Sequence, residues 1–535
     1  MPITNDTGGD TIKHNKILSG FVWAFLFVLL ELGLLLNKTK SWAQNMFGGV
    51  TAEEIIFHMK VPLQGTDTST IYSFIQDALL PSLKELLFFI ILFFVLSHVE
   101  RALRSKLEKR YTESVLLEVK RPIKKHSFSN GRYFLLKIPA RIFAIFALIV
   151  FVYNTYSICK VYSVGDYIKQ QMTSSKWIED QYVQPDENLL TWPKKKRNLI
   201  YLFLESMEST YTSEEYGGAF KENLIPELTA LANENISFTN RENLLGGAVA
   251  ISNTGWTIAG MVAQTSGIPL KLPINGNAMD EYSVFLPGVT SIGDLLEDAG
   301  YHNCLMIGSD AAFGGRKNYF EQHGNYEIRD YNWALETGVI PEGYHVFWGM
   351  EDESLFRAAK DTLLEFADND EPFNLTLLTV DSHFPNGYRC ELCQYQHNNN
   401  YKDAISCSSR QVAAFIEWVQ HQDFYEDTTI VISGDHLTMA ADLTEEMKSN
   451  DRSIYNCIIN PACEPSNDHE RIFTTMDMFP TTLAAMGVTI DGDRLGLGTN
   501  LFSKQKTLTE EFGLSFEDDE LMKNSDFYNK VLLYP

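Results

Sequence analysis

The chain has few basic residues for its length. Only 44 Lys and Arg stand against 69 Asp and Glu among 535 residues, so the net charge is −25. The shortage is uneven: residues 1–160 hold 19 basic and 12 acidic residues, and the remainder holds 25 basic and 57 acidic ones. This acidic remainder argues against nucleic acid as a partner, because a surface that binds nucleic acid needs Lys and Arg to neutralise the phosphates. The asymmetry predicts two unlike parts, one basic and one acidic.

Cysteine patterns that bind zinc are also scarce. Cys390-x-x-Cys393 has no second C-x-x-C or H-x-x-x-H to complete a zinc site. We therefore favour disulfides, which are allowed if the acidic part lies outside the cytoplasm. We expect Cys457 to pair with Cys463, and Cys407 to pair with either Cys390 or Cys393.

Long apolar runs are confined to the basic part. Three runs, at 17–36, 79–99 and 139–158, are long enough or nearly long enough to cross a bilayer of roughly 30 Å. The first is too long for a cleaved signal peptide and is followed by further runs. Two basic runs, "RALRSKLEKRY" and "KRPIKKHSF", lie between the second and third apolar runs, and the positive-inside tendency therefore places Arg101–Arg141 in the cytoplasm. The acidic part is then extracytoplasmic, on the periplasmic side of the cytoplasmic (inner) membrane.

These observations predict four regions. Residues 1–159 form a membrane domain with about three transmembrane helices, and 160–197 form a linker that suits an amphipathic helix on the membrane surface. Residues 198–505 form the extracytoplasmic domain, and 506–535 form a C-terminal tail.

The extracytoplasmic domain alternates apolar strands with helices. Continuous apolar strands are expected at 198–205, 302–310, 373–384 and 428–436, and helices at 289–301, 408–422 and 474–488. Uninterrupted apolar strands are typical of a parallel sheet that is buried on both faces. The sequence therefore predicts an α/β fold, with a mostly parallel central sheet covered by helices on both faces.

Polar side chains gather where these strands end. In parallel sheets, ligands bind beyond the carboxyl ends of the strands. A set of carboxylates with histidine at this edge favours a metal or catalytic site, and the mixture suits Mn²⁺ or Zn²⁺ better than Ca²⁺. The residues at or just past the strand ends are Glu205, Asp310, Asp381, His383, Asp435 and His436.

Thr257 lies where the polar stretch "SNTGW" becomes the apolar helical run "IAGMV". One interpretation is a helix N-cap, since hydroxyl side chains satisfy the free amides of a first turn. The other is a nucleophile at the positive end of a helix, where phosphate also binds well. Thr254, three residues earlier, is a rival for the nucleophile, and we prefer Thr257 because it directly precedes the apolar helical run.

Taken together, the motifs resemble a known family. "NLIYLFLES", "NTGWTIAGM", "WGMEDESLF", "VDSHFP" and "SGDH" occur in this order in the lipoteichoic acid synthase-like phosphoglycerol transferases, including the type that acts on periplasmic glucans. These enzymes belong to the alkaline phosphatase and sulfatase superfamily. The resemblance covers about 198–500, with "TMDMFPTTLAAMG" and "LGLGTNLF" near its end.

The resemblance implies a site. Its metal ligands would be Glu205, Thr257, Asp435 and His436, with Thr257 as the nucleophile and Mn²⁺ as the metal, Zn²⁺ and Mg²⁺ being alternatives. Coordination favours the alkoxide that a threonine nucleophile needs. The substrate-binding residues would be Arg316, Trp348, Asp381 and His383, of which Trp348 and Asp381 fit a structural role equally well.

The resemblance also implies a reaction. The donor would be phosphatidylglycerol, and phosphoglycerol would pass through a covalent threonine intermediate to a hydroxyl of an envelope glycan, such as a periplasmic glucan. A phosphoethanolamine transferase with the same fold is the alternative within the superfamily. A sulfatase is disfavoured, because the Cys-x-Pro-x-Arg pattern is missing around Thr257. A non-catalytic, membrane-anchored sensor or binding protein is the alternative of another class.

Overall fold

The computed structural model describes residues 8–49, 51–60, 68–118, 138–271, 284–369 and 371–534. The backbone divides into two compact units. The helical unit comprises Met1–Asn45 and Thr68–Val164, and the sheet unit comprises Met46–Asp67 and Gly165–Pro535. The sheet unit is therefore built from two separate stretches of the sequence.

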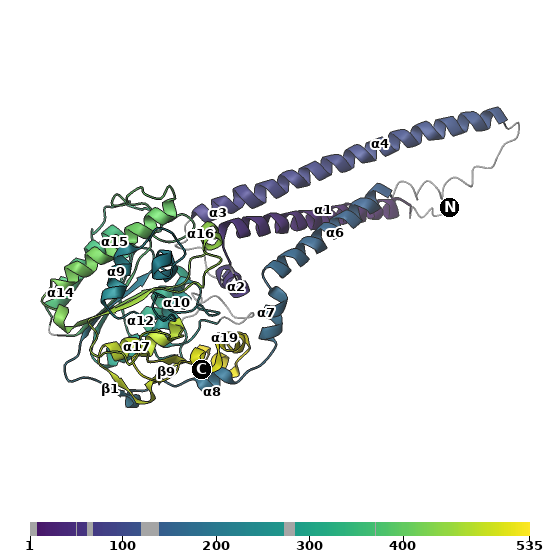
Figure 1. Cartoon of the computed structure of the whole chain (residues 1–535). Helices are drawn as coiled ribbons and strands as arrows, with labels where there is room; N and C mark the ends of the chain where they lie inside the picture. The colour runs from purple at the N-terminus through teal and green to yellow at the C-terminus, as the bar shows by residue number, and fades with distance from the viewer. Residues whose placement is uncertain are drawn as a thin grey trace, which may run out of the picture. The chain divides into compact units, whose positions relative to one another are not determined.

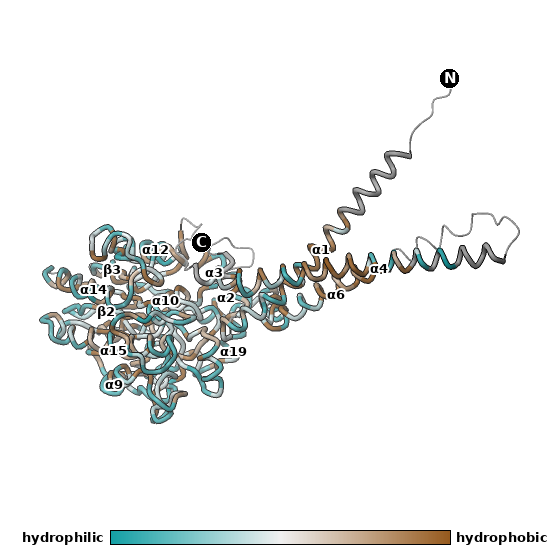
Figure 2. The backbone as a smooth tube through the Cα atoms, turned by 90° about the horizontal axis from the view of Figure 1, so that it is seen from above, coloured by the Kyte–Doolittle hydropathy of each residue, from teal (hydrophilic) through white to brown (hydrophobic). Residues whose placement is uncertain are grey.

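Three long helices dominate the helical unit: α1 (Gly8–Met46), α4 (Leu80–Glu118) and α6 (Ile138–Val161). The short helix α3 (Thr68–Phe74) and a π-helical turn, Ile75–Leu79, lead into α4. Three spans are long and apolar enough to cross a membrane: Phe21–Met46 in α1, Thr70–Leu103, which runs from α3 through the π-helical turn into α4, and Arg141–Val161 in α6. Figure 2 shows these spans as the most hydrophobic parts of the chain. The chain is a membrane protein with three candidate spans in its described residues.

Packing within the helical unit uses a few small and apolar side chains. Leu30 and Leu34 of α1 bury themselves against Phe143 and Ala147 of α6. Glu31 lies in the candidate span of α1 and has a polar partner: the hydroxyl of Ser82 on α4 donates a 2.7 Å hydrogen bond to its Oε1. This contact links the carboxylate of α1 to α4. The second basic run of the sequence, "KRPIKKHSF", lies outside the described residues.

A six-stranded sheet forms the centre of the sheet unit (Figure 1), in the order β4-β3-β5-β2-β6-β7. All neighbours are parallel except β6 and β7. The mostly parallel sheet predicted from the sequence is confirmed. The strands are β2 (Asn198–Leu204), β3 (His302–Ile307), β4 (Glu327–Arg329), β5 (Phe373–Leu378), β6 (Thr428–Gly434) and β7 (Asn456–Ile459).

Helices cover both faces of the sheet, as predicted. Alternate residues of β2 point to opposite sides, so Tyr201 and Phe203 join one core cluster and Leu202 and Leu204 join the other. The first cluster is completed by α10 (Thr257–Ser266), α11 (Ile292–Asp298) and α17 (Met478–Ala485). The second is completed by α9 (Pro226–Glu234), α14 (Asp352–Ala367) and α15 (Asn400–Gln420).

Short elements complete the sheet unit. The two-residue strands β1 (Leu190–Thr191) and β8 (Thr489–Ile490) pair with each other, as do β9 (Arg494–Leu495) and β10 (Gly498–Thr499). The remaining helices are α2 (Ala52–Lys60), α7 (Val164–Gln171), α8 (Trp177–Gln181), α12 (Arg316–Gln322), α13 (Tyr331–Glu336), α16 (Ala441–Glu446), α18 (Leu508–Phe512) and α19 (Leu514–Met522).

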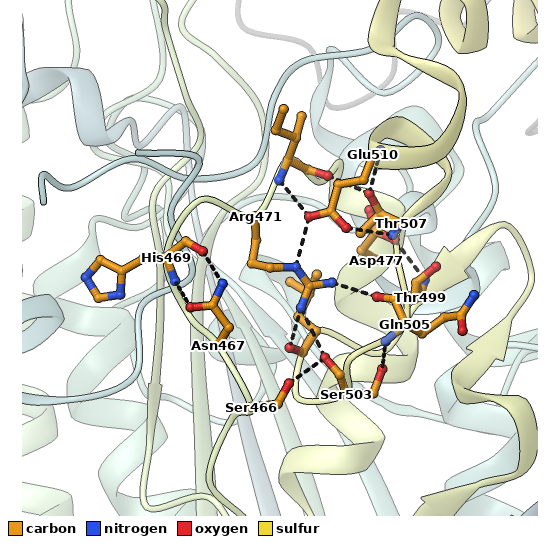
Figure 3. Close-up of polar contacts among 12 residues, drawn as sticks. Ser466, Asn467, His469, Arg471, Asp477, Thr499, Ser503, Gln505, Thr507 and Glu510 are labelled. Carbon is orange, nitrogen blue, oxygen red and sulfur yellow. Dashed lines mark hydrogen bonds and ion pairs between the residues drawn. The ribbon is translucent and has the colours of Figure 1, made fainter. Parts of the chain in front are cut away.

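The segments expected to be a linker and a tail contribute to the core of this unit. Trp177 and Ile178 of α8 join the cluster of α10 and α17, and so do Leu521 of α19 and Tyr528. A polar network fixes the last segment (Figure 3): Arg471 donates from Nε to Glu510 at 2.9 Å and from Nη2 to the Gln505 carbonyl at 2.9 Å. Residues 506–534 are therefore tied to the sheet unit by both apolar and ionic contacts.

Candidate active site

Two adjacent strands deliver the central residues of the site. Leu204 at the end of β2 lies opposite Gly434 at the end of β6, so the next residues, Glu205 and Asp435, emerge side by side. His436 follows at once. Ligand atoms of Glu205, Asp435 and His436, here called the Glu205 cluster, all lie within 4.8 Å of one another. The structure thus brings together three of the six side chains that the strand-end argument had grouped.

Hydrogen bonds orient each member of this cluster. The backbone N–H groups of Ser206 and His436 donate to Asp435 Oδ1 at 2.7 and 2.8 Å. The Ser206 hydroxyl donates to Glu205 Oε1 at 2.7 Å. Ser206 has a positive φ of 52°, an uncommon conformation for a residue other than glycine. This turn directs its N–H and its hydroxyl at the two carboxylates.

Thr257 is the first residue of α10, and Trp256 is the N-cap. The threonine hydroxyl therefore does not cap the helix. Its Oγ1 lies 3.3 Å from Glu205 Oε2 and 3.5 Å from His436 Nε2. The Thr254 hydroxyl, in contrast, donates to the Ile251 carbonyl at 2.7 Å. Of the two threonines, only Thr257 contacts the Glu205 cluster, and it does so at the positive end of a helix.

Gly260 permits this close approach of α10. A Cβ at this position would lie only 2.1 Å from the backbone oxygen of Asp435. The helix can pack directly against the Asp435 turn because residue 260 has no side chain.

The cluster concentrates negative charge out of reach of water. Glu205 and Asp435 are 2% and 0% exposed. Burial, followed by the repulsion of Glu205, raises the pKa of Asp435 to about 8. Burial also acts to raise the pKa of Glu205, but His383, His436 and hydrogen bonds outweigh it and lower that pKa. Two carboxylates that are both buried and this close repel each other, so a positively charged group beside them would stabilise their ionised forms.

These residues fit a divalent metal. Asp435 Oδ2 is buried with no hydrogen-bond partner among the described residues. The Nδ1 of His436 donates to the Leu437 carbonyl at 2.8 Å, so in the neutral ring Nε2 carries the lone pair, and Nε2 faces the two carboxylates. Carboxylate oxygens with one imidazole nitrogen are a ligand set for Mn²⁺ or Zn²⁺.

His383 and Trp348 form a neighbouring group. Their ring centroids are 4.7 Å apart. His383 Nδ1 donates to the Phe384 carbonyl at 2.7 Å, which leaves Nε2 as an acceptor. Burial lowers the pKa of His383, although the charge of Glu205 opposes the shift. The indole Nε1 of Trp348 is buried without an acceptor among the described residues.

Arg316 opens α12 and is 6% exposed. It donates to the carbonyls of Phe313 and Asp310 at 2.9 and 2.8 Å. Burial lowers its pKa to about 10, against the attraction of Glu205. The guanidinium therefore stays charged near neutral pH and is held by backbone carbonyls, which leave part of its donor capacity for an anion.

Asp381 and Asp310 have other partners. Asp381 Oδ1 accepts from the Asp352 backbone N–H at 3.2 Å, and the Asp352 carboxylate accepts from the backbone N–H groups of Val380 and Asp381. Burial, then the charge of Asp352, raises the pKa of Asp381 well above its usual range. The Asp310 side chain accepts from the Ala312 backbone N–H. These contacts support the structural interpretation of Asp381.

One site residue escaped the sequence argument. Glu54 lies on α2, in the stretch that joins two candidate membrane helices, and is 7% exposed. A Cβ on Gly255, two residues before Thr257, would lie 2.7 Å from Glu54 Oε1. Burial raises the pKa of Glu54 to about 7, while the charge of His436 opposes the rise. Thr51 and Glu54 in "TAEE" have the spacing of a capping box, and both of its reciprocal hydrogen bonds form. In the sequence, however, this pattern predicts only the start of a helix and not a place beside Thr257.

The same stretch makes two further contacts with the larger part of the sheet unit, Gly165–Pro535. The rings of Phe47 and Phe384 pack edge to face at 5.1 Å, and the Gly48 N–H donates to the Met439 carbonyl. Residues on both sides of the site, after β5 and after β6, are therefore in contact with Met46–Lys60.

All seven cysteines carry free thiols in the structure. Cys457 and Cys463 direct their sulfur atoms at different carbonyls, those of Leu231 and Ala484, so the proposed pair is not seen. Cys390, Cys393 and Cys407 lie together as unbonded thiols.

Comparisons with known proteins agree with this fold. A family model described as Sulfatase matches residues 197–488. Phosphoglycerol transferase I of Salmonella choleraesuis (strain SC-B67) is 33% identical over 357 residues, which are 65% of this chain and 44% of that protein. Phosphoglycerol transferase I of Xanthomonas axonopodis pv. citri (strain 306) is 32% identical over 296 residues, 54% of this chain and 40% of that protein. The chain thus spans less than half the length of these curated relatives.

Solved structures are similar at low identity. An alkaline phosphatase superfamily protein from Vibrio parahaemolyticus is 24% identical, with a TM-score of 0.48 and coverage of 62% of this chain and 77% of that one. The lipoteichoic acid synthase LtaP from Listeria monocytogenes is 20% identical, with a TM-score of 0.46 and coverage of 61% and 81%.

Proposed function

Because the chain belongs to the sulfatase family, we propose that it is a membrane-anchored phosphotransferase that moves phosphoglycerol from phosphatidylglycerol to a hydroxyl of an envelope glycan. The observation that carries the proposal is the Thr257 hydroxyl, 3.3 Å from Glu205 and 3.5 Å from His436 at the start of a helix. The relatives named phosphoglycerol transferase I support the choice of headgroup.

The sheet unit belongs on the periplasmic side of the cytoplasmic membrane in this proposal. Support comes from the basic segment Arg101–Arg141, which the positive-inside tendency assigns to the cytoplasm. The candidate membrane helices then keep the site close to its lipid donor and raise the effective donor concentration.

The first step transfers phosphoglycerol to the enzyme. The Thr257 oxygen attacks the phosphorus of phosphatidylglycerol, an oxygen–phosphorus bond forms, and the bond to the diacylglycerol oxygen breaks. That oxygen takes up a proton, and diacylglycerol leaves. Glu205, Thr257, Asp435 and His436 would hold a divalent cation, whose positive charge would favour the ionised threonine oxygen and offset charge on the phosphoryl group. Mn²⁺ is our first choice of metal.

The second step returns Thr257 to its free form. A glycan hydroxyl attacks the same phosphorus, the Thr257–phosphorus bond breaks, and the threonine oxygen regains a proton. His383 suits the role of base for the incoming hydroxyl, because burial keeps it neutral with Nε2 as an acceptor. Arg316 and the Trp348 Nε1–H are donors for the phosphoglycerol oxygens.

Peptide mass spectrometry tests the proposal directly. We expect the full-length protein in detergent, incubated with phosphatidylglycerol and Mn²⁺, to carry a glycerophosphate adduct on Thr257. A Thr254→Ala variant serves as the control and should form the same adduct. An adduct seen only with phosphatidylethanolamine would replace the headgroup assignment with phosphoethanolamine. Diacylglycerol release that persists in a Thr257→Ala variant would refute the covalent route.

A further inference from the structure

A second group of metal-ligating side chains lies outside the Glu205 cluster. Cys390 and Cys393 lie between β5 and α15, and Cys407 lies on α15 itself. We call these three residues the cysteine cluster. They are 5%, 6% and 1% exposed, and their sulfur atoms all lie within 4.8 Å of one another. The C-x-x-C pattern contains only two of these thiols. The third, that of Cys407, comes from α15, 14 residues after Cys393 in the chain.

The spacing of the sulfur atoms distinguishes two kinds of chemistry. Cys390 Sγ lies 3.8 Å from Cys393 Sγ and 3.7 Å from Cys407 Sγ. A tetrahedral zinc site with Zn–S bonds of about 2.3 Å has sulfur–sulfur edges of roughly 3.8 Å. A disulfide brings two sulfur atoms to about 2.05 Å and would leave the third thiol buried beside it. The two distances from Cys390 match edges of a metal tetrahedron, and Cys393 and Cys407 lie within 4.8 Å of each other.

The surroundings favour ligands over inert thiols. The Cys393 N–H donates to the Cys390 carbonyl at 3.2 Å, so the C-x-x-C segment turns both thiols to one side. Gln411, one turn after Cys407 on α15, points Nε2 at the sulfur atoms of Cys407 and Cys390, at 3.5 and 3.7 Å. Amide N–H groups aimed at sulfur are the outer contacts that stabilise metal-bound thiolates.

From this geometry we propose that the cysteine cluster is a second metal site, which binds a thiophilic divalent cation such as Zn²⁺ through three thiolates. Three protein ligands leave the fourth tetrahedral position to water or another small ligand. The bound ion joins the Cys390–Cys393 segment to α15. That segment begins seven residues after His383, so the ion also limits the movement of the chain that carries His383. The proposal does not depend on the proposed transferase reaction.

Cobalt(II) provides a test that ignores activity. The full-length protein is purified in detergent without oxygen and titrated with Co²⁺. We expect a near-ultraviolet charge-transfer band from thiolate to cobalt, which Zn²⁺ then abolishes. The oxygen-rich Glu205 cluster gives no such band, so an Asp435→Asn variant should keep it. Cys393→Ser and Cys407→Ser should each lose or strongly weaken the band, and Cys463→Ser is the matched control that keeps it.

Two results would overturn the proposal. One is the absence of the band in reduced, folded wild-type protein. The other is a disulfide between any two of the three cysteines in protein isolated without reductant, measured by alkylation and peptide mass spectrometry. Circular dichroism checks the fold of each variant. Because Cys393 lies outside α15, its variant keeps the test decisive even if the Cys407 change disturbs the helix.

Discussion

Thr257, the proposed nucleophile, lies at the start of α10 and contacts Glu205 and His436. We expect Thr257→Ala to lower diacylglycerol release from phosphatidylglycerol by about 10³-fold or more, because no other oxygen replaces the nucleophile. Thr257→Ser keeps a hydroxyl and should lose much less. The measurement is the initial rate in mixed micelles, with a matched Thr254→Ala control whose rate should equal wild type. Equal rates for Thr257→Ala and wild type would remove Thr257 from the mechanism.

Gly260 offers a second test beside the site. Gly260→Ala places a methyl group 2.1 Å from the Asp435 backbone oxygen, so α10 or the Asp435 turn must shift. We expect weaker Mn²⁺ binding by calorimetry and a lower melting temperature. Gly165→Ala is the control, because a Cβ there has no neighbour within 4 Å; it should leave the metal affinity unchanged and should not lower the melting temperature, since Ala favours a helix more than Gly does. An unchanged metal affinity in Gly260→Ala would show that the close approach is not needed.

Individual site residues were predictable where strand ends determine them. Glu205, Asp435 and His436 follow apolar runs that could only be buried strands, and neighbouring parallel strands end at one edge. Asp381 follows the same rule, yet its carboxylate lies against Asp352, a pairing that no local pattern reveals. Glu54 could not be found, since it approaches Gly255 from about 200 residues away in the sequence.

The helix α19 carries a pH-sensitive carboxyl group. Burial raises the pKa of Glu517 to about 8, and the charges of Asp477 and Asp518 add to the rise while Thr509 and Arg494 oppose it. The folded state therefore binds a proton that the unfolded state releases above its ordinary pKa, so stability falls as the pH rises from about 4.5 to 8. We expect Glu517→Gln to melt at a higher temperature than wild type at pH 8 and at nearly the same temperature at pH 5. A difference that does not change with pH would contradict this account.

The contacts between α18 and Arg471 can be tested by stability alone. Arg471→Met leaves Glu510 without the guanidinium that Figure 3 shows beside it. Removing one partner of a largely buried ion pair should cost about 3 kcal/mol of unfolding free energy. Denaturant unfolding in detergent measures the loss. Lys530→Met removes the exposed pair with Asp526 and should have no measurable effect; a similar loss in both variants would mean that burial is not the cause.

Helices and strands with a long hydrophobic pattern could be predicted from the sequence, and short ones could not. The strands β2, β3, β5 and β6 are continuous apolar runs, and each begins at the residue expected, but β3 and β5 end three and six residues earlier than expected. The helices α8, α18 and α19 have only five, five and nine residues, too few for helical periodicity to emerge from the sequence. Their stability comes from the core that they join, as Trp177 and Leu521 show.

The two-part sheet unit predicts a property of the molecule as a whole. We expect residues 165–535 expressed alone to gain stability from a synthetic peptide of residues 46–60, because Phe47, Gly48 and Glu54 regain their contacts. The expected effect at saturating peptide is a rise of about 2 °C or more in melting temperature. A Phe47→Ala peptide should produce a smaller rise. No rise with either peptide would mean that Met46–Lys60 adds little to the fold.

The discontinuity of the sheet unit has a consequence for proteolytic shedding. A protease that cuts the chain between α6 and α8 releases a fragment with Glu205, Thr257, Asp435 and His436 intact. The fragment leaves Glu54 behind, however, because Met46–Lys60 lies between the first two candidate membrane spans. A shed form would therefore retain every proposed metal ligand and still differ from the intact protein beside Thr257. Soluble fragments made in the laboratory differ from the intact protein in the same way.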